Sequence, residues 1–278
     1  MSGLAISSWS LHRDLGPAYW GLDLVEGRRA AAYPYGQGSY TLLDLPAVVA
    51  ALGIQQLEIC HFHFPETGAA YLGALRARLD AAQVQPLSLL IDEGDITADD
   101  AMARRHDLDR IRAWIDVAAA LGAAQARVIA GLAAPSPDGA AVRRSAEGLA
   151  LLADYGAARG VRVITENWLG ISMDPDSLLA ILRQAGAAVG LCVDFGNYTG
   201  PGKYEALAAL LPHATSIHTK ATFTPPGIMD RDEFVRGLDL ARQARFDGPY
   251  VLIFDSEADE RASLARMVEV VRPYLGNA

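Results

Sequence analysis

The sequence predicts an α/β protein, a single (β/α)8 TIM barrel over residues 1-278 with a long loop after the first strand. Short apolar runs alternate eight times with longer helical stretches, which is the pattern of repeated strand–helix units. A length of 278 residues with 51% apolar residues suits one barrel with a large core. No Gly-x-Gly-x-x-Gly follows the first strand, so an open dinucleotide-binding sheet is disfavoured.

The strand candidates are short β-branched or apolar runs beginning near Leu4, Gln56, Pro86, Ala126, Val161, Val189, Thr215 and Tyr250. The helical stretches repeat apolar residues at steps of three and four, and include 101–121, 140–159, 176–185, 232–245 and 260–274. Four glycines that follow helices are expected to be left-handed caps: Gly122, Gly160, Gly186 and Gly248.

One connection is too long for an ordinary turn. It runs from Leu11 to Thr41 and is rich in Gly, Tyr and Arg. A connection of this length in a compact domain is typical of a lid or binding loop. Its tyrosines Tyr33, Tyr35 and Tyr40 either close over a pocket or form a dimer surface.

The charge balance and termini argue against several classes of partner. The formal net charge of −9 repels nucleic acid and anionic membranes. No apolar run approaches the roughly 20 residues of a membrane span, and no signal peptide is expected at the N-terminus. Cys60 and Cys192 are expected to be buried thiols and do not form a disulfide framework. We therefore expect a cytoplasmic protein.

Three successive strands end in side chains that bind metals. Glu166, Asp194 and His218 close the fifth, sixth and seventh strand candidates. The active site of a barrel lies at the carboxyl ends of its strands, so these side chains are expected to converge there. Mixed oxygen and nitrogen donors suit Mn²⁺, Co²⁺, Mg²⁺ or Zn²⁺. The alternative is that each side chain caps its own strand or pairs with a neighbour.

These motifs resemble the sugar phosphate isomerase/epimerase superfamily, which has a xylose-isomerase-like barrel. The resemblance rests on Glu166-Asn-Trp-Leu-Gly-Ile-Ser, Asp194-Phe-Gly-Asn197 and Ile217-His-Thr-Lys220. Ser8-Trp-Ser-Leu-His12-Arg and Leu57-Glu58-Ile support it, and it spans nearly the whole chain. It implies that Glu166, Asp194 and His218 are three of four metal ligands, and that Glu166 is also an acid/base carboxylate.

The chain departs from that family at the fourth ligand, a Glu at the end of strand eight. Here Gly248-Pro-Tyr-Val-Leu-Ile253-Phe-Asp255 puts Ile253 in the ligand position. Asp255 lies about 6.6 Å further along the strand and would need a water or a bulge to reach the site. In the family this fourth carboxylate is also the usual second acid/base group. Epimerisation with two bases would therefore lack its obvious second base in this chain.

Several other polar and aromatic residues are candidates. His61 is a candidate acid/base and His63 a hydroxyl-binding imidazole, unless they only begin a solvated loop. Arg127 either neutralises Glu58 or Glu166 or binds a substrate anion, and Lys220 either holds an oxyanion or pairs with Asp194 or Asp255. The remaining substrate-binding candidates are Trp9, His12, Asn167, Trp168, Asn197 and Asp255.

The leading hypothesis is a divalent-metal-dependent isomerase or epimerase of a sugar, polyol or sugar acid, acting through an enediolate-type intermediate. A metal-dependent dehydratase of a polyhydroxy ketone is the second enzyme hypothesis, because one base suffices for it. A non-catalytic sugar-binding barrel with an incomplete metal site is the third. The expected partner is a small carbohydrate, and a homo-oligomer is suggested by the resemblance alone.

Overall fold

Eight parallel strands close into a barrel, as the sequence predicts. The structure is a computed structural model and describes residues 3–20 and 29–276. The barrel strands run in chain order around the sheet, and β10 pairs with β1 through Leu4 and Tyr250 to close it. They are β1 (Leu4–Ser7), β4 (Gln56–Cys60), β5 (Gln85–Ile91), β6 (Gln125–Val128), β7 (Arg162–Glu166), β8 (Gly190–Asp194), β9 (Ser216–Lys220) and β10 (Tyr250–Ile253).

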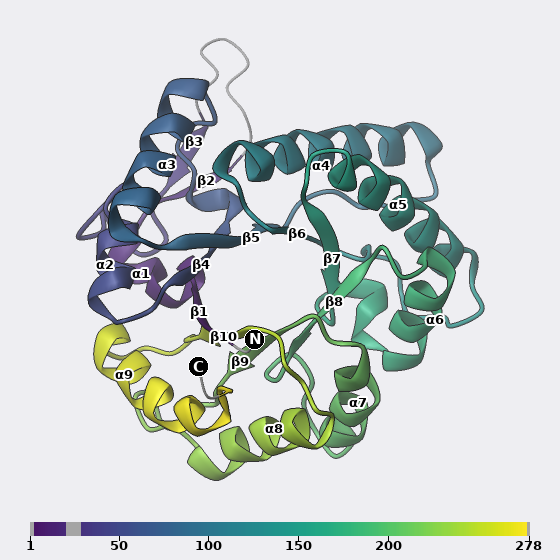
Figure 1. Cartoon of the computed structure of the whole chain (residues 1–278). Helices are drawn as coiled ribbons and strands as arrows, with labels where there is room; N and C mark the ends of the chain where they lie inside the picture. Colours follow the sequence, from purple (N-terminus) through teal and green to yellow (C-terminus); the bar gives the residue numbers. More distant parts are fainter. Residues whose placement is uncertain (1–2, 21–28, 277–278) are drawn as a thin grey trace.

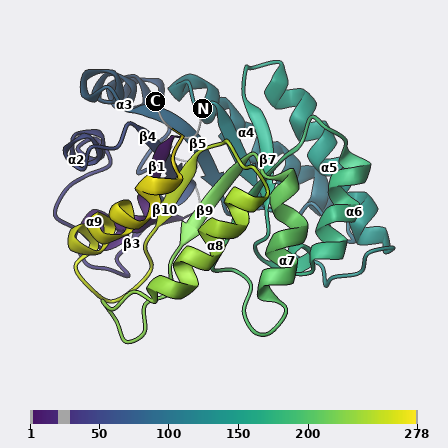
Figure 2. The ribbon, with the colours of Figure 1, turned by 60° about the horizontal axis from the view of Figure 1, so that its bottom comes forward.

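Helices surround the barrel as an outer ring (Figure 1). Seen from a second direction, they lie along the outside of the strands (Figure 2). Among the described residues the α-helices are α1 (His12–Leu15), α2 (Leu45–Ala51), α3 (Ala69–Ala82), α4 (Ala101–Leu121), α5 (Ala140–Ala157), α6 (Pro175–Ala185), α7 (Lys203–Leu210), α8 (Arg231–Gln243) and α9 (Glu260–Val271). Short 3-10 helices cover Ser8–Leu11, His61–His63, Gly170–Met173, Leu211–His213 and Arg272–Tyr274.

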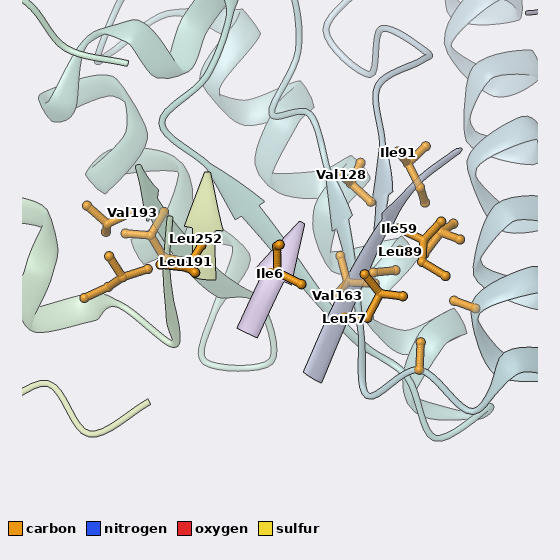
Figure 3. Close-up of a cluster of buried hydrophobic side chains, with 14 of the residues drawn as sticks. Ile6, Leu57, Ile59, Leu89, Ile91, Val128, Val163, Leu191, Val193 and Leu252 are labelled. Carbon is orange, nitrogen blue, oxygen red and sulfur yellow. The ribbon is translucent and has the colours of Figure 1, made fainter. Parts of the chain in front are cut away.

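Side chains alternate between two cores along each strand. Residues such as Ile6, Leu191 and Val193 point outward and pack under the helices (Figure 3). A separate apolar cluster of Ala5, Leu87, Val251 and Ile253 fills part of the interior of the barrel. This alternation determines which side chains can reach a site inside the barrel. The neighbours in sequence of an outward-facing residue on a strand face the barrel axis.

The long connection after β1 contains a small hairpin that the sequence analysis did not identify. Strands β2 (Ala18–Trp20) and β3 (Ala30–Ala32) pair antiparallel. The expected loop is therefore partly ordered by backbone hydrogen bonds. Residues 21–28 of that connection lie outside the described residues.

The predicted left-handed cap is confirmed at Gly122, with φ 74° and ψ 27°, and Gly160 also has positive φ. Gly186 ends α6 with positive φ but an extended ψ of 174°, so it is not a left-handed helical cap. The prediction for Gly248 is wrong, because its φ is not positive. A Cβ at Gly248 would lie 2.7 Å from the carbonyl oxygen of Thr215, so glycine is required there by close packing.

Helix α9 is tied to the start of the long connection through one buried carboxylate. Glu260 accepts hydrogen bonds from the backbone N–H groups of Arg13 and Asp14, at 2.9 and 3.3 Å. Burial raises the pKa of Glu260 to about 7, against the lowering effect of those two N–H groups. The folded protein therefore binds a proton here at pH values where the unfolded chain has lost it.

We expect the free energy of unfolding to fall as pH rises from about 4.5 to 7, because Glu260 must ionise in a buried place. The Glu260→Gln variant stays neutral at this position over the whole pH range. Its free energy of unfolding, relative to that of the wild type, should therefore rise by roughly 3 kcal/mol between pH 4.5 and pH 7. Urea unfolding at a series of pH values measures the difference. The exposed Glu269→Gln on the same helix is the control, and parallel curves for wild type and Glu260→Gln would contradict the assignment.

Candidate functional site

A cavity of about 810 Å³ opens at the carboxyl ends of the barrel strands. Its wall combines strand ends with the β2–β3 hairpin and the segment that follows it. Ten of the sequence-predicted site residues line it: Trp9, His63, Arg127, Glu166, Trp168, Asp194, Asn197, His218, Lys220 and Asp255.

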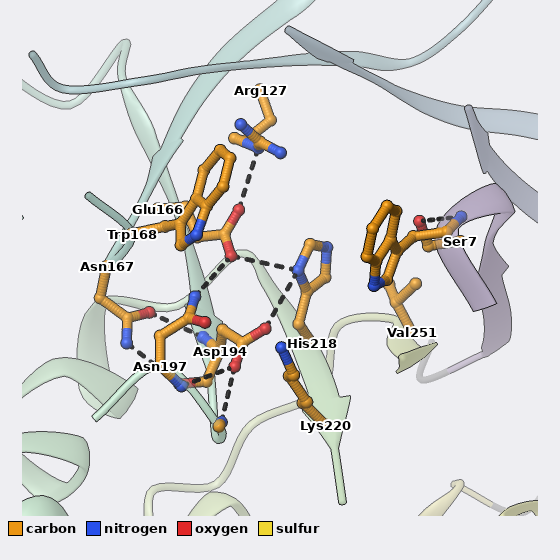
Figure 4. Close-up of polar contacts among 12 residues, drawn as sticks. Ser7, Arg127, Glu166, Asn167, Trp168, Asp194, Asn197, His218, Lys220 and Val251 are labelled. Carbon is orange, nitrogen blue, oxygen red and sulfur yellow. Dashed lines mark hydrogen bonds and ion pairs between the residues drawn. The ribbon is translucent and has the colours of Figure 1, made fainter. Parts of the chain in front are cut away.

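Glu166, Asp194 and His218 converge in this cavity (Figure 4). All three are buried, and each offers a potential ligand atom within 4.8 Å of the others. The Nδ1 atom of His218 lies 3.3 Å from Oε1 of Glu166 and 3.6 Å from Oδ2 of Asp194. Donors bonded to one ion at about 2.1 Å in tetrahedral geometry lie about 3.4 Å apart, so these distances fit a shared cation.

The second oxygen of each carboxylate is held by another partner. Oδ1 of Asp194 accepts hydrogen bonds from the backbone N–H groups of Gly196 and Asn197, at 2.6 and 3.0 Å. Oε2 of Glu166 lies 2.9 Å from Nε of Arg127. Each carboxylate is thus fixed in orientation, with its remaining oxygen directed to the centre.

Glu58 orients the imidazole from the opposite side. Its Oε2 lies 2.8 Å from Nε2 of His218, and its Oε1 accepts a hydrogen bond from Ser88 at 2.8 Å. With Nε2 bonded to Glu58, Nδ1 is the ring nitrogen that faces the two carboxylates and that a cation would take, as in histidine ligands supported by a carboxylate. Glu58 therefore acts on His218 from behind and does not itself line the cavity.

The electrostatics of this cluster favour a cation. Although burial opposes it, Cys192, Glu166 and Glu58 raise the pKa of His218 well above its usual value. Burial would raise the pKa of Glu166, but His218 and Arg127 bring it down to about 2. The same negative potential that retains a proton on His218 attracts a divalent ion, which competes with that proton.

Arg127 serves as the counter-charge inside the barrel. Its Nη1 lies 2.5 Å from Oδ1 of Asp92, while its Nε faces Glu166. The guanidinium also lies under the indole of Trp168, 5.0 Å from the ring centre. The sequence left open whether Arg127 pairs with carboxylates of the protein or binds a substrate anion. The structure shows pairing with carboxylates of the protein, Asp92 and Glu166.

Apolar side chains and an ion pair occupy the place where a fourth ligand would be expected. Ile253 ends β10 and lines the cavity. Asp255 does not join the cluster of potential ligands found among the described residues, and its Oδ2 lies 2.9 Å from Nζ of Lys220. Burial lowers the pKa of Lys220, but Asp194 and Asp255 raise it overall, so the pair is ionic.

Three predicted site residues lie behind the cavity wall and not on it. His12 stacks on Trp9 with ring centres 4.1 Å apart. His61 is fully buried and accepts a hydrogen bond from the backbone N–H of Asp92, and burial with the charge of Arg29 lowers its pKa to about 2. Asn167 exchanges two hydrogen bonds with the backbone of Asp194, at 2.7 and 3.0 Å. In these places the three side chains support residues that do line the cavity.

Some lining residues were not singled out by the sequence. Asp92 follows β5 and pairs with Arg127 at the barrel mouth. Trp20 and Phe62 line the cavity and stack on each other with ring centres 4.9 Å apart. The aromatic residues of the first long loop are the sequence feature that could have pointed to Trp20. The direction of the Trp20 side chain, however, depends on the β2–β3 hairpin.

We predict that Glu58→Gln weakens binding of Mn²⁺ by 10- to 100-fold, because the amide no longer fixes the His218 tautomer. Isothermal titration of the purified protein with MnCl₂ measures the change. Glu93→Gln lies outside the proposed ligand cluster and serves as the control. Unchanged affinity in Glu58→Gln would show that the imidazole needs no such support.

Comparison with other proteins was made through sequence and through structure. A family model described as xylose isomerase-like TIM barrel matches residues 46–269. A search of curated proteins found no significant match.

Many solved structures share the fold. D-psicose 3-epimerase with D-tagatose from Clostridium cellulolyticum H10 is 13% identical with a TM-score of 0.71, covering 98% of this chain and 99% of that one. A 3-keto-D-glucoside 4-epimerase from E. coli is 17% identical with a TM-score of 0.63, covering 82% and 94%. A xylose isomerase-like barrel protein from Mycobacterium smegmatis in complex with magnesium is 18% identical with a TM-score of 0.66, covering 99% and 98%.

At these identities the structural likeness establishes the fold alone, and several of the similar structures are sugar epimerases. The family model covers most of the chain, from α2 to α9. On this evidence the chain belongs to the xylose isomerase-like TIM barrel family.

Proposed function

We propose that this protein is a divalent-metal-dependent isomerase or epimerase of a sugar, polyol or sugar acid. The observation that carries the proposal is the convergence of Glu166, Asp194 and His218 in a cavity at the carboxyl ends of the strands. The epimerases of similar fold and the magnesium complex support it.

The donor set suits a divalent cation. Two carboxylate oxygens and one imidazole nitrogen are ligands that Mn²⁺, Co²⁺, Mg²⁺ and Zn²⁺ accept. Three protein ligands leave open positions for hydroxyl and carbonyl oxygens of a substrate. A bound cation would polarise a substrate carbonyl and stabilise the negative charge that develops on its oxygen.

The surrounding residues supply orientation and proton transfer. Glu166 is held ionised by His218 and Arg127, so its carboxylate is ready to accept a proton from the carbon next to a carbonyl. Lys220 lines the cavity as a cation and can hold an oxyanion or return a proton. Asn197 donates a hydrogen bond to Oε1 of Glu166 at 3.0 Å, which fixes the direction of that oxygen.

A dehydratase is the second candidate, and Ile253 is the observation that favours it. With Ile253 at the cavity wall and Asp255 bound to Lys220, β10 and the segment after it supply no free carboxylate to act as a second base beside Glu166. Removal of a proton next to a carbonyl followed by loss of hydroxide needs one such base. Lys220 could protonate the departing hydroxide.

We predict about one divalent ion per chain after mild purification. Elemental analysis of the dialysed protein measures the content. The His218→Ala variant should lose the ion, whereas the peripheral His106→Ala should keep it. A wild-type protein that binds neither Mn²⁺ nor Mg²⁺ would favour the non-catalytic sugar-binding barrel.

We predict that incubation with a ketose panel in D₂O and Mn²⁺ introduces deuterium beside the carbonyl. Retention of all hydroxyl groups in the product supports the isomerase or epimerase, and a dehydrated product supports the lyase. Glu166→Gln should lower either activity by at least about 1,000-fold, because it removes the base. Nuclear magnetic resonance and mass spectrometry detect the products, and activity that survives in Glu166→Gln would rule out this residue as the base.

A further inference from the structure

The cavity has two chemically different halves. Most of its charged residues come from neighbouring strands, because Asp92 follows β5 and the others belong to β6 to β9, namely Arg127, Glu166, Asp194, His218 and Lys220. Asp255, which follows β10, is paired with Lys220. The opposite half is built by β10, β1 and β4 together with the β2–β3 hairpin, and its lining is mainly aromatic and aliphatic. A ligand that fills the cavity must therefore meet two different surfaces.

The apolar half is a continuous wall of aromatic rings. Tyr35 lies edge-on to Trp9 with ring centres 6.1 Å apart, and Trp9 lies edge-on to Phe62 at 6.0 Å. Phe62 in turn stacks on Trp20 at 4.9 Å. Ile253 extends this wall, because Trp9 packs against the cluster that contains Ile253.

The wall is accessible at its outer end. Trp20, Tyr33 and Tyr35 are 47%, 52% and 38% exposed, although each carries a large apolar surface. Exposed aromatic residues gathered at the edge of a cavity mark a binding surface. The cavity volume of about 810 Å³ lies in the range of sites that enclose ligands larger than one sugar ring.

The chemistry of the wall decides what it binds. A second sugar ring would need partners for each hydroxyl that leaves water. Trp9 and Trp20 carry one indole N–H each and Phe62 carries no polar group, so the polar atoms of this half are few and the hydroxyls lie on Tyr33 and Tyr35. The ring faces suit a flat apolar group. An aromatic ring on the ligand fits this half better than a second carbohydrate.

We propose that the substrate is an aryl glycoside, whose sugar ring meets the charged half while its aromatic aglycone packs against Trp9, Trp20 and Tyr35. The sugar part of this inference rests on the proposed function, and the aglycone part rests on the aromatic wall. Because a glycosidic bond leaves no carbonyl at the anomeric carbon, the carbonyl required for proton transfer lies on another carbon of the ring.

Paired glycosides test the inference with the full chain in MnCl₂. Phenyl and methyl β-D-glucoside, and the corresponding galactosides, differ only in the aglycone. Isothermal titration should show the phenyl member of at least one pair binding 10- to 100-fold more tightly, because only that ring buries against the wall. Trp20→Ala should lower phenyl glycoside affinity at least fivefold and leave methyl glycoside affinity within twofold. Tyr204→Ala removes an aromatic ring from α7, outside the cavity, and should change neither.

The outcomes separate this inference from the proposed function. Equal affinities within both pairs, or no binding of either phenyl glycoside, would overturn the aglycone assignment and leave the metal chemistry standing. A phenyl preference that is lost in Trp20→Ala supports the assignment. If that preference is found while the wild type with Mn²⁺ introduces no deuterium into any ketose and forms no dehydrated product, the aglycone assignment stands and the proposed function fails.

Discussion

The structure of this site depends on compensation among charges that are removed from water. Glu58, Arg127, Glu166, Asp194 and His218 are all buried at the mouth of the barrel. An isolated charge there would cost several kcal/mol, so each must face an opposite charge or a strong hydrogen bond. The observed pairings form one connected set, from Asp92 through Arg127, Glu166 and His218 to Glu58.

This connected set determines which atoms remain available for a ligand. Arg127 occupies one oxygen of Glu166, backbone N–H groups occupy one oxygen of Asp194, and Glu58 occupies one nitrogen of His218. The three remaining donor atoms face each other. Preorganisation of this kind lowers the reorganisation that binding or catalysis requires, because the donor atoms already face one centre and Asn197 holds Oε1 of Glu166 in direction.

The change at Ile253 affects both chemistry and specificity. An apolar side chain at that position removes a carboxylate from the centre and also joins the wall that contains Trp9. Asp255, two residues on, is bound to Lys220 and does not replace it. In the proposed site, Ile253 thus accounts both for the missing fourth carboxylate and for added apolar surface in the same cavity, which links the proposed reaction type to the proposed kind of substrate.

The sequence alone determined the barrel and the three side chains that converge at its mouth. Alternation of strands and helices predicts the closed sheet, and the barrel topology places Glu166, Asp194 and His218 at one end of it. No helix among the described residues is long and apolar enough to cross a membrane, in agreement with the absence of long apolar runs. These features follow from local periodicity, which a single sequence carries.

The tertiary structure decided which polar residues reach the cavity. His61 and His63 share one strand face by simple alternation, yet they belong to a short 3-10 helix that buries His61 and leaves His63 at the wall. The partners of Arg127, the direction of Trp20 and the pairing of Asp255 with Lys220 also depend on contacts between distant segments. Such contacts are set by packing across the barrel, so no local pattern in the sequence could specify them.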